Sequence, residues 1–364
     1  MNFQTVDYID WFRINWHDID YDLATSGLHP VSLSDVNIHL DDLNLGKTLF
    51  FGHPKLVEMI SEIYGVEENE ILITSGSTHA NYLMCALLIE QGDEVIIERP
   101  VYTPLLDVVK FFGAKVKYLE RKYEEGYNLN LEQLKEMTGK DTRMMVFTNL
   151  HNPSGAMTNE KTLKAISEIA DDNNIYVLSD EVYRDFIFEN APPIFSSLTQ
   201  LGISTCSVSK FYGAGALRVG WAMCREELVD KARKLNDYIL AANSCGGEEI
   251  AALIMENRSW FVEKIMNITK RNRPLVKSWI EKREDLEGIV PRHGFICFPR
   301  LLLDIDSMEL TELLLKKYRT MISPARFFDC EKHIRIGYGG DEMILEKGLE
   351  YLGFALDELG GSEK

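Results

Sequence analysis

Short apolar runs alternate with longer amphipathic stretches through the first two thirds of the chain. Runs of four or five apolar residues that end at polar or turn-forming residues predict strands, and the periodic stretches between them predict helices. The predicted strands are 71–75, 94–98, 115–119, 144–147 and 175–178, and the predicted helices are 80–91, 105–112, 131–137 and 158–170. Strands that alternate with helices favour an α/β fold with a mostly parallel sheet covered on both faces.

The pattern changes after Ala222, where helices dominate as far as about Glu284. Shorter strands, such as 294–298 and 333–337, then lie among helices. This change predicts a second, smaller α+β domain, which we expect to include the N-terminal segment. The expected boundaries are 45–260 for the large domain and 1–44 together with 261–364 for the small one.

Aromatic residues are concentrated near the N-terminus: they are Tyr8, Trp11, Phe12, Trp16 and Tyr21. Large aromatic side chains are usually buried against other parts of a fold. We therefore interpret this segment as packing or subunit contact, and not as a binding site.

The charge of the chain excludes some classes of partner. Its 364 residues carry a formal net charge of −18, which argues against general binding to nucleic acid or to anionic membranes. No apolar run approaches the roughly 20 residues of a membrane-spanning helix, and no secretory signal pattern is present. We therefore expect a cytoplasmic protein with no nucleic-acid or membrane partner. No His-Glu-x-x-His pairing occurs among the eight histidines, which argues against a metal hydrolase, so no metal is expected.

Polar residues follow several predicted strands, at the edge where open α/β sheets bind their ligands. Asp180 and Tyr183 follow one buried strand, and the turn Asn152-Pro153-Ser154-Gly155 follows the strand before it. Ser207-Val208-Ser209-Lys210 ends a third apolar run, and Arg218 stands eight residues after the lysine. A shared edge of the sheet would bring these side chains close together.

The step Gly76-Ser77-Thr78 leads directly from a predicted strand into a helix. Unpaired backbone N–H groups and the helix dipole make such a helix start a ready phosphate site. Alone, the Gly76-Ser77-Thr78 step is weak evidence for a phosphate site. It stands before the strand-end motifs described above in the chain, and it gains weight only together with them.

In this order and spacing the motifs resemble those of the fold-type I pyridoxal 5′-phosphate (PLP) enzymes of the aspartate aminotransferase family, specifically the class I/II aminotransferases. The resemblance extends from about Leu23 to Leu352, and its strongest part is Ser207-x-x-Lys210 followed by Arg218 and Gly220. It implies a mostly parallel, seven-stranded type of sheet in a large PLP-binding domain, with a smaller α+β domain from both termini. It also implies a homodimer with active sites at the subunit boundary.

The resemblance implies that Lys210 forms a Schiff base with PLP and then moves the proton between the substrate Cα and the cofactor. Asp180 would pair with the pyridine nitrogen and keep it protonated, so that the ring withdraws electrons. Asn152 and Tyr183 would hydrogen-bond the ring oxygen O3′, and Tyr102 would stack on the ring. Lys210, Asp180 and Tyr183 are the expected catalytic residues.

The phosphate would bind at Gly76, Ser77 and Thr78, with Ser207 and Arg218 as side-chain partners; an arginine suits a phosphate because it can form two parallel charge-assisted hydrogen bonds.

The substrate α-carboxylate would bind Arg335, in His333-Ile334-Arg335-Ile336-Gly337, with Asn152 and the backbone of Gly27 close to it. A dicarboxylic substrate would need a further cation, for which the candidates are Arg13, Arg292 and Arg326.

One segment departs from the family's pattern. The family usually has a tyrosine that reaches the PLP phosphate of the partner subunit, in a segment that corresponds here to 46–54. This chain has Phe50 and Phe51 in that segment. Either the hydroxyl contact is missing, or another residue such as His53 provides it.

The resemblance therefore implies an aminotransferase that exchanges an amino group between an α-amino acid and a 2-oxo acid. A β-lyase or an amino-acid decarboxylase of the same fold is the alternative, because the same cofactor serves all three reactions. A ligand-sensing module of a transcription regulator is disfavoured, since the fold begins within about the first 30 residues.

Overall fold

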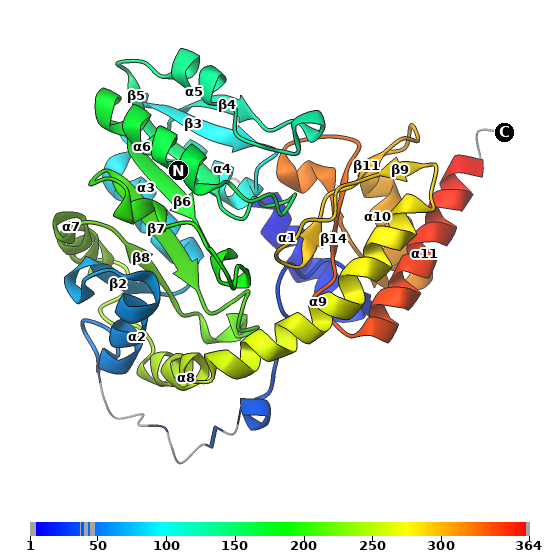
Figure 1. The fold of residues 1–364 in the computed structure, drawn as a ribbon, viewed down its shortest axis with the longest axis horizontal. Helices are drawn as coiled ribbons and strands as arrows, with labels where there is room; N and C mark the ends of the chain where they lie inside the picture. Colours follow the sequence, from blue (N-terminus) through cyan, green and yellow to red (C-terminus); the bar gives the residue numbers. More distant parts are fainter. Residues whose placement is uncertain (1–4, 37, 40–42, 44–47, 362–364) are drawn as a thin grey trace.

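Seven strands form one central sheet (Figure 1) in the computed structural model, which describes residues 5–36, 38–39, 43 and 48–361. In spatial order the strands are β2 (Ile71–Thr74), β8 (Gly220–Met223), β7 (Gly202–Ser207), β6 (Tyr176–Asp180), β5 (Thr142–Thr148), β3 (Glu94–Arg99) and β4 (Lys115–Glu120). Every neighbouring pair is parallel except the two pairs that involve β8. The mostly parallel seven-stranded sheet is therefore confirmed.

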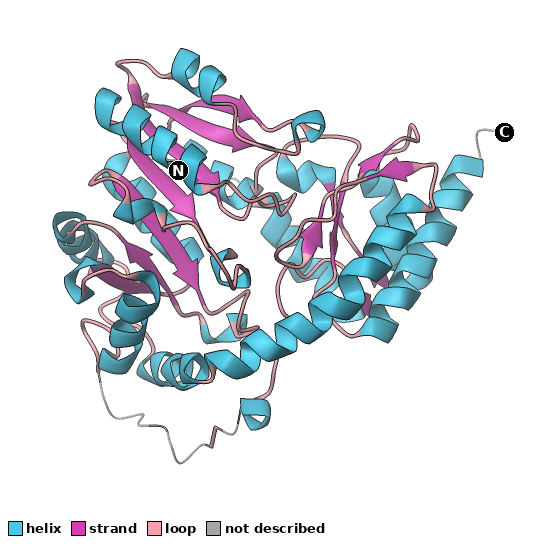
Figure 2. Cartoon of the chain, viewed as in Figure 1, coloured by secondary structure: helices cyan, strands magenta, loops and turns pink. Residues whose placement is uncertain are grey.

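Helices cover both faces of this sheet (Figure 2). One face packs against α3 (Ser77–Leu88), α4 (Thr103–Phe111) and α7 (Glu226–Asn236). The other face packs against α2 (Pro54–Tyr64), α5 (Leu131–Met137), α6 (Glu160–Asn173) and α8 (Cys245–Glu256). Successive residues of a strand point to opposite faces, so Val146 packs on the first side and Phe147 on the second. Burial on both sides explains why these strands are continuous apolar runs.

A second group of elements lies beyond the sheet, at the far end of the long helix α9 (Arg258–Glu281) (Figure 1). It contains α10 (Ser307–Tyr318), α11 (Glu342–Gly361) and the strand sets β10 (Ile296–Cys297)–β14 (Ile334–Gly337)–β13 (Ser323–Pro324) and β11 (Arg300–Leu301)–β9 (Leu286–Glu287). The N-terminal segment joins this group, because β1 (Tyr21–Asp22) pairs in parallel with β12 (Thr320–Met321). The exact boundaries of the two domains stay a prediction, and the one at residues 44 and 45 lies outside the described part of the chain.

Two helix starts differ from the sequence prediction. Helix α3 begins at Ser77, three residues before the predicted start, because Gly76 (φ +84°) lets the chain turn from β2 directly into the helix. Helix α6 begins at Glu160, two residues after the predicted start, because Asn159 caps it: the Asn159 side chain accepts a hydrogen bond from the Thr162 N–H.

Over the described residues, none of the helices combines the length and the apolar character needed to cross a membrane.

Candidate active site

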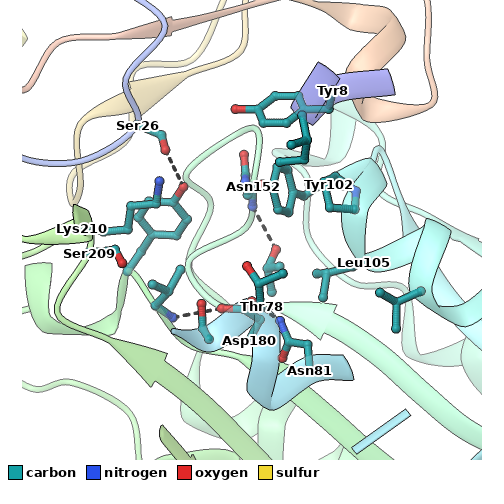
Figure 3. Close-up of a pocket in the computed structure, with 18 of the residues that line it drawn as sticks. Tyr8, Ser26, Thr78, Asn81, Tyr102, Leu105, Asn152, Asp180, Ser209 and Lys210 are labelled. Carbon is teal, nitrogen blue, oxygen red and sulfur yellow. Dashed lines mark hydrogen bonds between the residues drawn. The ribbon is translucent and has the colours of Figure 1, made fainter. Parts of the chain in front are cut away.

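A cavity of about 390 Å³ lies at the carboxyl ends of β5, β6 and β7, between the central sheet and the second group of elements (Figure 3). This volume falls in the range of about 300–1,000 Å³ that is usual for small-molecule sites. Nine of the twelve residues expected at a site line it: Ser77, Thr78, Tyr102, Asn152, Asp180, Tyr183, Lys210, Arg218 and Arg335.

The other three expected residues, Gly76, Ser207 and Gly27, lie directly behind this lining. A Cβ atom at Gly76 would overlap the Arg218 guanidinium. The Ser207 side chain is fully buried, and its Oγ accepts a hydrogen bond from the Ser209 N–H at 3.2 Å. A Cβ atom at Gly27 would lie 2.7 Å from the Lys210 carbonyl oxygen, so the glycine permits the N-terminal segment to pass close to the lysine.

The first turn of α3 forms one end of the cavity. The N–H groups of Ser77 and Thr78 belong to this turn, where the helix itself supplies no acceptor. Arg218 stands beside the turn and donates a hydrogen bond to the Ser75 carbonyl at 3.3 Å. A Cβ atom at Gly220 would lie 2.5 Å from the Ser77 nitrogen, so only a glycine lets β8 pass this close. N–H groups, hydroxyls and a guanidinium together suit a phosphate.

Asp180 ends β6 at the floor of the cavity and is almost fully buried. Its Oδ2 accepts a hydrogen bond from the Asn81 side chain at 2.8 Å, and its Oδ1 accepts one from the Val182 N–H at 3.2 Å. Burial raises the pKa of this carboxyl, while the two hydrogen bonds and Lys210 oppose the shift. A cationic group bound against Asp180 would restore its ionised form, because an opposite charge nearby stabilises the carboxylate.

Lys210 follows β7 and points into the cavity from the side opposite Tyr102 (Figure 3). The pKa of its amine is lowered to about 8. Burial is the main cause and the positive charge of Arg335 also lowers the pKa, while the negative charge of Asp180 opposes the shift. A larger fraction of this amine is neutral near pH 7 than for an exposed lysine, and the neutral amine is the form that attacks a carbonyl.

Arg335 is fully buried in β14 and makes hydrogen bonds to four different groups. Its Nη1 donates to the Asn152 side-chain oxygen at 2.9 Å, and its Nη2 donates to the Tyr8 hydroxyl, the Ala24 carbonyl and the Ser323 hydroxyl at 2.8–3.3 Å. These contacts hold the guanidinium in one orientation at the wall of the cavity. A fixed guanidinium suits a carboxylate, which it can bind through two hydrogen bonds.

Asn152 is held from behind by a buried chain of polar groups. Its N–H donates to the Thr148 hydroxyl at 2.8 Å, and that hydroxyl donates to Glu98 Oε1 at 2.6 Å. Glu98 forms a fully buried ion pair with Arg121 at 2.8 Å. Burial raises the pKa of Glu98 to about 7, and Arg121 opposes the shift. The amide that meets Arg335 therefore has a rigid support.

The two tyrosines expected at the cofactor differ in their present contacts. The Tyr183 hydroxyl donates a hydrogen bond to Ser26 Oγ at 2.8 Å, and burial raises the pKa of this phenol to about 12. Tyr102 presents a half-buried ring whose edge-on contact with Tyr8 has a centroid distance of 5.0 Å.

Sequence reasoning missed five polar residues that line the cavity: Tyr8, Ser26, Asn81, Thr148 and Ser209. Asn81 could have been found, because it stands one helical turn after Ser77 and so shares its face. Tyr8 belongs to the aromatic segment interpreted as packing. It does pack, against Phe12 and Phe327, but its hydroxyl also reaches Arg335, so that interpretation was incomplete.

Phe50 and Phe51 do not line this cavity, and both are exposed on the single chain, by 65% and 70%. His53 does not line it either, and its N–H donates to Glu248 at 2.6 Å. Positions 46 and 47 of this segment lie outside the described residues.

Comparison with known proteins identifies the family. The model for aminotransferases of class I and II matches residues 40–352. The chain belongs to this family. It is 27% identical to a capreomycidine synthase from Streptomyces vinaceus, over 96% of this chain and 92% of that protein, and 28% identical to an aspartate aminotransferase from Pyrococcus horikoshii, over 84% and 82%.

Solved structures agree with the fold of this class I/II aminotransferase family member. A PLP-dependent aminotransferase from Streptococcus suis superposes with a TM-score of 0.92 at 28% identity, covering 98% of this chain and 99% of that one. The PLP-dependent cyclase OrfR superposes with a TM-score of 0.89 at 22% identity, covering 99% of this chain and 98% of that one. At this level of identity the likeness shows a shared fold alone. Membership of the family implies PLP as the cofactor. The first turn of α3, Asp180 and Lys210 have the chemistry that suits this group.

The lowered pKa of Lys210 predicts how PLP attachment depends on pH. The rate at which the apoprotein forms a borohydride-reducible bond to PLP should rise about tenfold per pH unit and level off above pH 8, because only the neutral amine attacks. Stopped-flow absorbance across pH 6–10 measures this rate. In Arg335→Ala the midpoint should move upward, since a cation that lowers the pKa is removed. A midpoint near the ordinary lysine value in the unmodified protein would contradict the prediction.

Proposed function

We propose that the protein is a PLP-dependent aminotransferase that moves an amino group between an α-amino acid and a 2-oxo acid. The observation that carries the proposal is the presence of Lys210, Asp180 and the Arg335–Asn152 pair in one cavity. This set supplies an amine that can hold the cofactor and move a proton, a carboxylate to pair with the protonated ring nitrogen, and a binding site for the substrate carboxylate.

Each residue has a distinct task in this reaction. When bound, PLP supplies a carbonyl for imine formation and a ring that stabilises negative charge at the substrate Cα. Lys210 would hold the cofactor through its amine and, when that amine is free, would accept the α-proton of the substrate, a task for which a pKa of about 8 is well suited. Asp180 would keep a proton on the ring nitrogen, and Arg218 with the first turn of α3 would bind the phosphate.

The buried arginine favours removal of the α-proton over loss of CO2. A carboxylate bound by Arg335 is stabilised as an anion, and its guanidinium partner is held by Asn152, Ser323 and Tyr8. Loss of CO2 would remove the negative charge that Arg335 binds, whereas loss of the α-proton keeps it. Transamination and not decarboxylation is therefore the reaction that this binding site supports best.

A single-turnover experiment tests the proposal. The PLP form, mixed with one amino acid at a time, should release one equivalent of 2-oxo acid and become the pyridoxamine form, which 2-oxoglutarate or pyruvate then converts back. Release of ammonia or CO2 with regeneration of PLP would instead indicate the β-lyase or decarboxylase alternative. The relative named capreomycidine synthase makes this measurement necessary, because family membership alone does not define the reaction.

Arg335→Ala should lower kcat/KM for α-amino acids by about 10- to 150-fold. A charge-assisted hydrogen bond contributes about 1.5–3 kcal/mol, and about 1.4 kcal/mol corresponds to a factor of ten. Arg335→Lys should recover little, because a point charge cannot form the paired contact. Steady-state kinetics of both variants, corrected for the folded fraction from urea unfolding, measures the loss. The control is Arg326→Ala, an exposed arginine outside the cavity; equal losses in the two alanine variants would contradict the role of Arg335.

We also propose that the protein is a homodimer with its active sites at the subunit boundary. Large side chains exposed on the single chain support this: Phe50, Phe51, Tyr238 and Ile239 are 52–91% exposed. Exposed apolar groups of this size often mark a protein interface. Sedimentation velocity should give twice the mass of the chain, and a fully active monomer in dilute solution would contradict the proposal.

A further inference from the structure

The cavity has an apolar and aromatic wall beside the carboxylate-binding group. Tyr8 and Ile9 of α1 (Asp7–Asn15) line it from the second group of elements, and Leu105 and Val108 of α4 line it from the sheet side. The Tyr102 ring lies between them. Figure 3 shows Tyr102 and Leu105 on the side of the cavity that faces away from Ser26 and Lys210.

One contact and the expected orientation of the substrate place this wall where a substrate side chain would lie. The Tyr8 hydroxyl is 3.3 Å from Arg335 Nη2, so the wall begins next to the group that binds the α-carboxylate. In the proposed reaction the α-amine joins the cofactor and the α-hydrogen faces Lys210, which lies on the opposite side of the cavity (Figure 3). The remaining substituent of the Cα, the side chain, is then left for the wall that begins at Tyr8.

No charged group remains in the described part of the lining to pair with a charged side chain. Its cations are Lys210, Arg218 and Arg335, and its one acid is Asp180; all four have a task in the proposed reaction. The cations considered for a second carboxylate do not line the cavity. The Arg13 side chain is 71% exposed and pairs with Asp10, and the Arg326 side chain is 64% exposed and pairs with Asp7. Arg292 is also exposed.

We propose that the preferred amino donors are α-amino acids with uncharged apolar or aromatic side chains, and that Tyr8, Ile9, Leu105 and Val108 determine this specificity. The inference rests on the proposed transaminase function for the placement of the substrate. An apolar side chain gains by leaving water for this wall, whereas a charged one would lose its hydration without gaining a partner. The preference is distinct from that of the relatives named aspartate aminotransferase.

The rate of the half-reaction with different amino acids tests the preference. The PLP form should react with leucine or phenylalanine with a kcat/KM at least about 100-fold above that for aspartate, glutamate or lysine. An aspartate, glutamate or lysine value equal to or above the leucine and phenylalanine values would overturn the inference. The same result would point to a charged group contributed by a second subunit.

A binding measurement separates this inference from the proposed reaction. α-Methyl-phenylalanine and α-methyl-aspartate have no α-hydrogen, so their affinity for the PLP form, read from the absorbance change, does not depend on transamination. Tighter binding of the phenylalanine analogue is expected. If the phenylalanine analogue binds more tightly but no 2-oxo acid forms from any amino acid, the proposed function fails and the side-chain preference stands. If the aspartate analogue binds more tightly, the preference is overturned whichever reaction occurs.

Two isoleucines of the same helix provide a matched pair of variants. Ile9→Ala should lower kcat/KM for leucine and phenylalanine by about 10-fold and leave the value for alanine within twofold, because a pocket distinguishes a few methylenes by about 10- to 200-fold. Ile14→Ala, 68% exposed and outside the cavity, should leave all three values unchanged. Indistinguishable profiles for the two variants would overturn the assignment of Ile9.

Discussion

Lys210→Ala is expected to lower the rate of the half-reaction by about 10²- to 10⁴-fold or more. In the proposed reaction the variant loses both the amine that would hold the cofactor and the base that would move the α-proton, and positioned proton transfer alone contributes about 10²- to 10⁴-fold. The buried site offers no second lysine among the described lining residues to replace it. Single-turnover kinetics with the best amino acid, at saturating PLP, measures the loss.

Chemical labelling gives this prediction a second readout. Borohydride reduction of the PLP form should attach the cofactor to the peptide that contains Lys210 and should leave Lys210→Ala unlabelled. Lys231→Ala, an exposed lysine on α7 that pairs with Glu227, is the control and should keep full activity and full labelling. Label on a different lysine in the unmodified protein would refute the assignment.

Asp180→Asn is expected to lower kcat by about 10²- to 10³-fold, the range observed when one preorganised electrostatic partner is removed from an active site. The asparagine keeps the shape of the side chain but not the negative charge that, in the proposed reaction, would hold a proton on the ring nitrogen. Cofactor affinity should fall much less, because the first turn of α3 and Arg218 still bind the phosphate. Steady-state kinetics and PLP titration of the apoprotein measure the two effects separately.

A second buried carboxyl provides the control for this variant. Asp185 accepts hydrogen bonds from Tyr64 and Arg258 and does not line the cavity. Asp185→Asn therefore removes a buried charge of the same kind without touching the site, and the kcat of its folded fraction should be unchanged. A similar kcat loss in both variants would mean that the effect of Asp180→Asn is structural.

Much of the site follows from local sequence pattern, because parallel strands bring their carboxyl ends to one edge of a sheet. Asp180 and Lys210 each stand at or just after the end of an apolar run, and the strands β6 and β7 that precede the cavity are parallel neighbours in the sheet. The turn at Gly76, proposed to bind the phosphate, was visible as a strand that passes directly into a helix.

Other features depend on contacts between segments far apart in the chain. Arg335 meets Asn152 across 183 positions, and Tyr8 meets Arg335 across 327. No periodicity of either segment encodes such a meeting, since periodicity reports only which face of an element is apolar. Tyr8 illustrates the limit: an aromatic residue that packs in a core and one that lines a cavity look the same in sequence.

By itself, the sequence determined the mostly parallel α/β sheet and the strand-end residues that suit a PLP enzyme, because these depend on local alternation and on motifs of short span. Only the tertiary structure decided which groups complete the cavity. It placed α1 over the site, gave Asp180 its partner Asn81, and left an apolar wall beside Arg335. The physical reason is that charge pairing and burial are set by atoms within a few ångströms, whichever part of the chain supplies them.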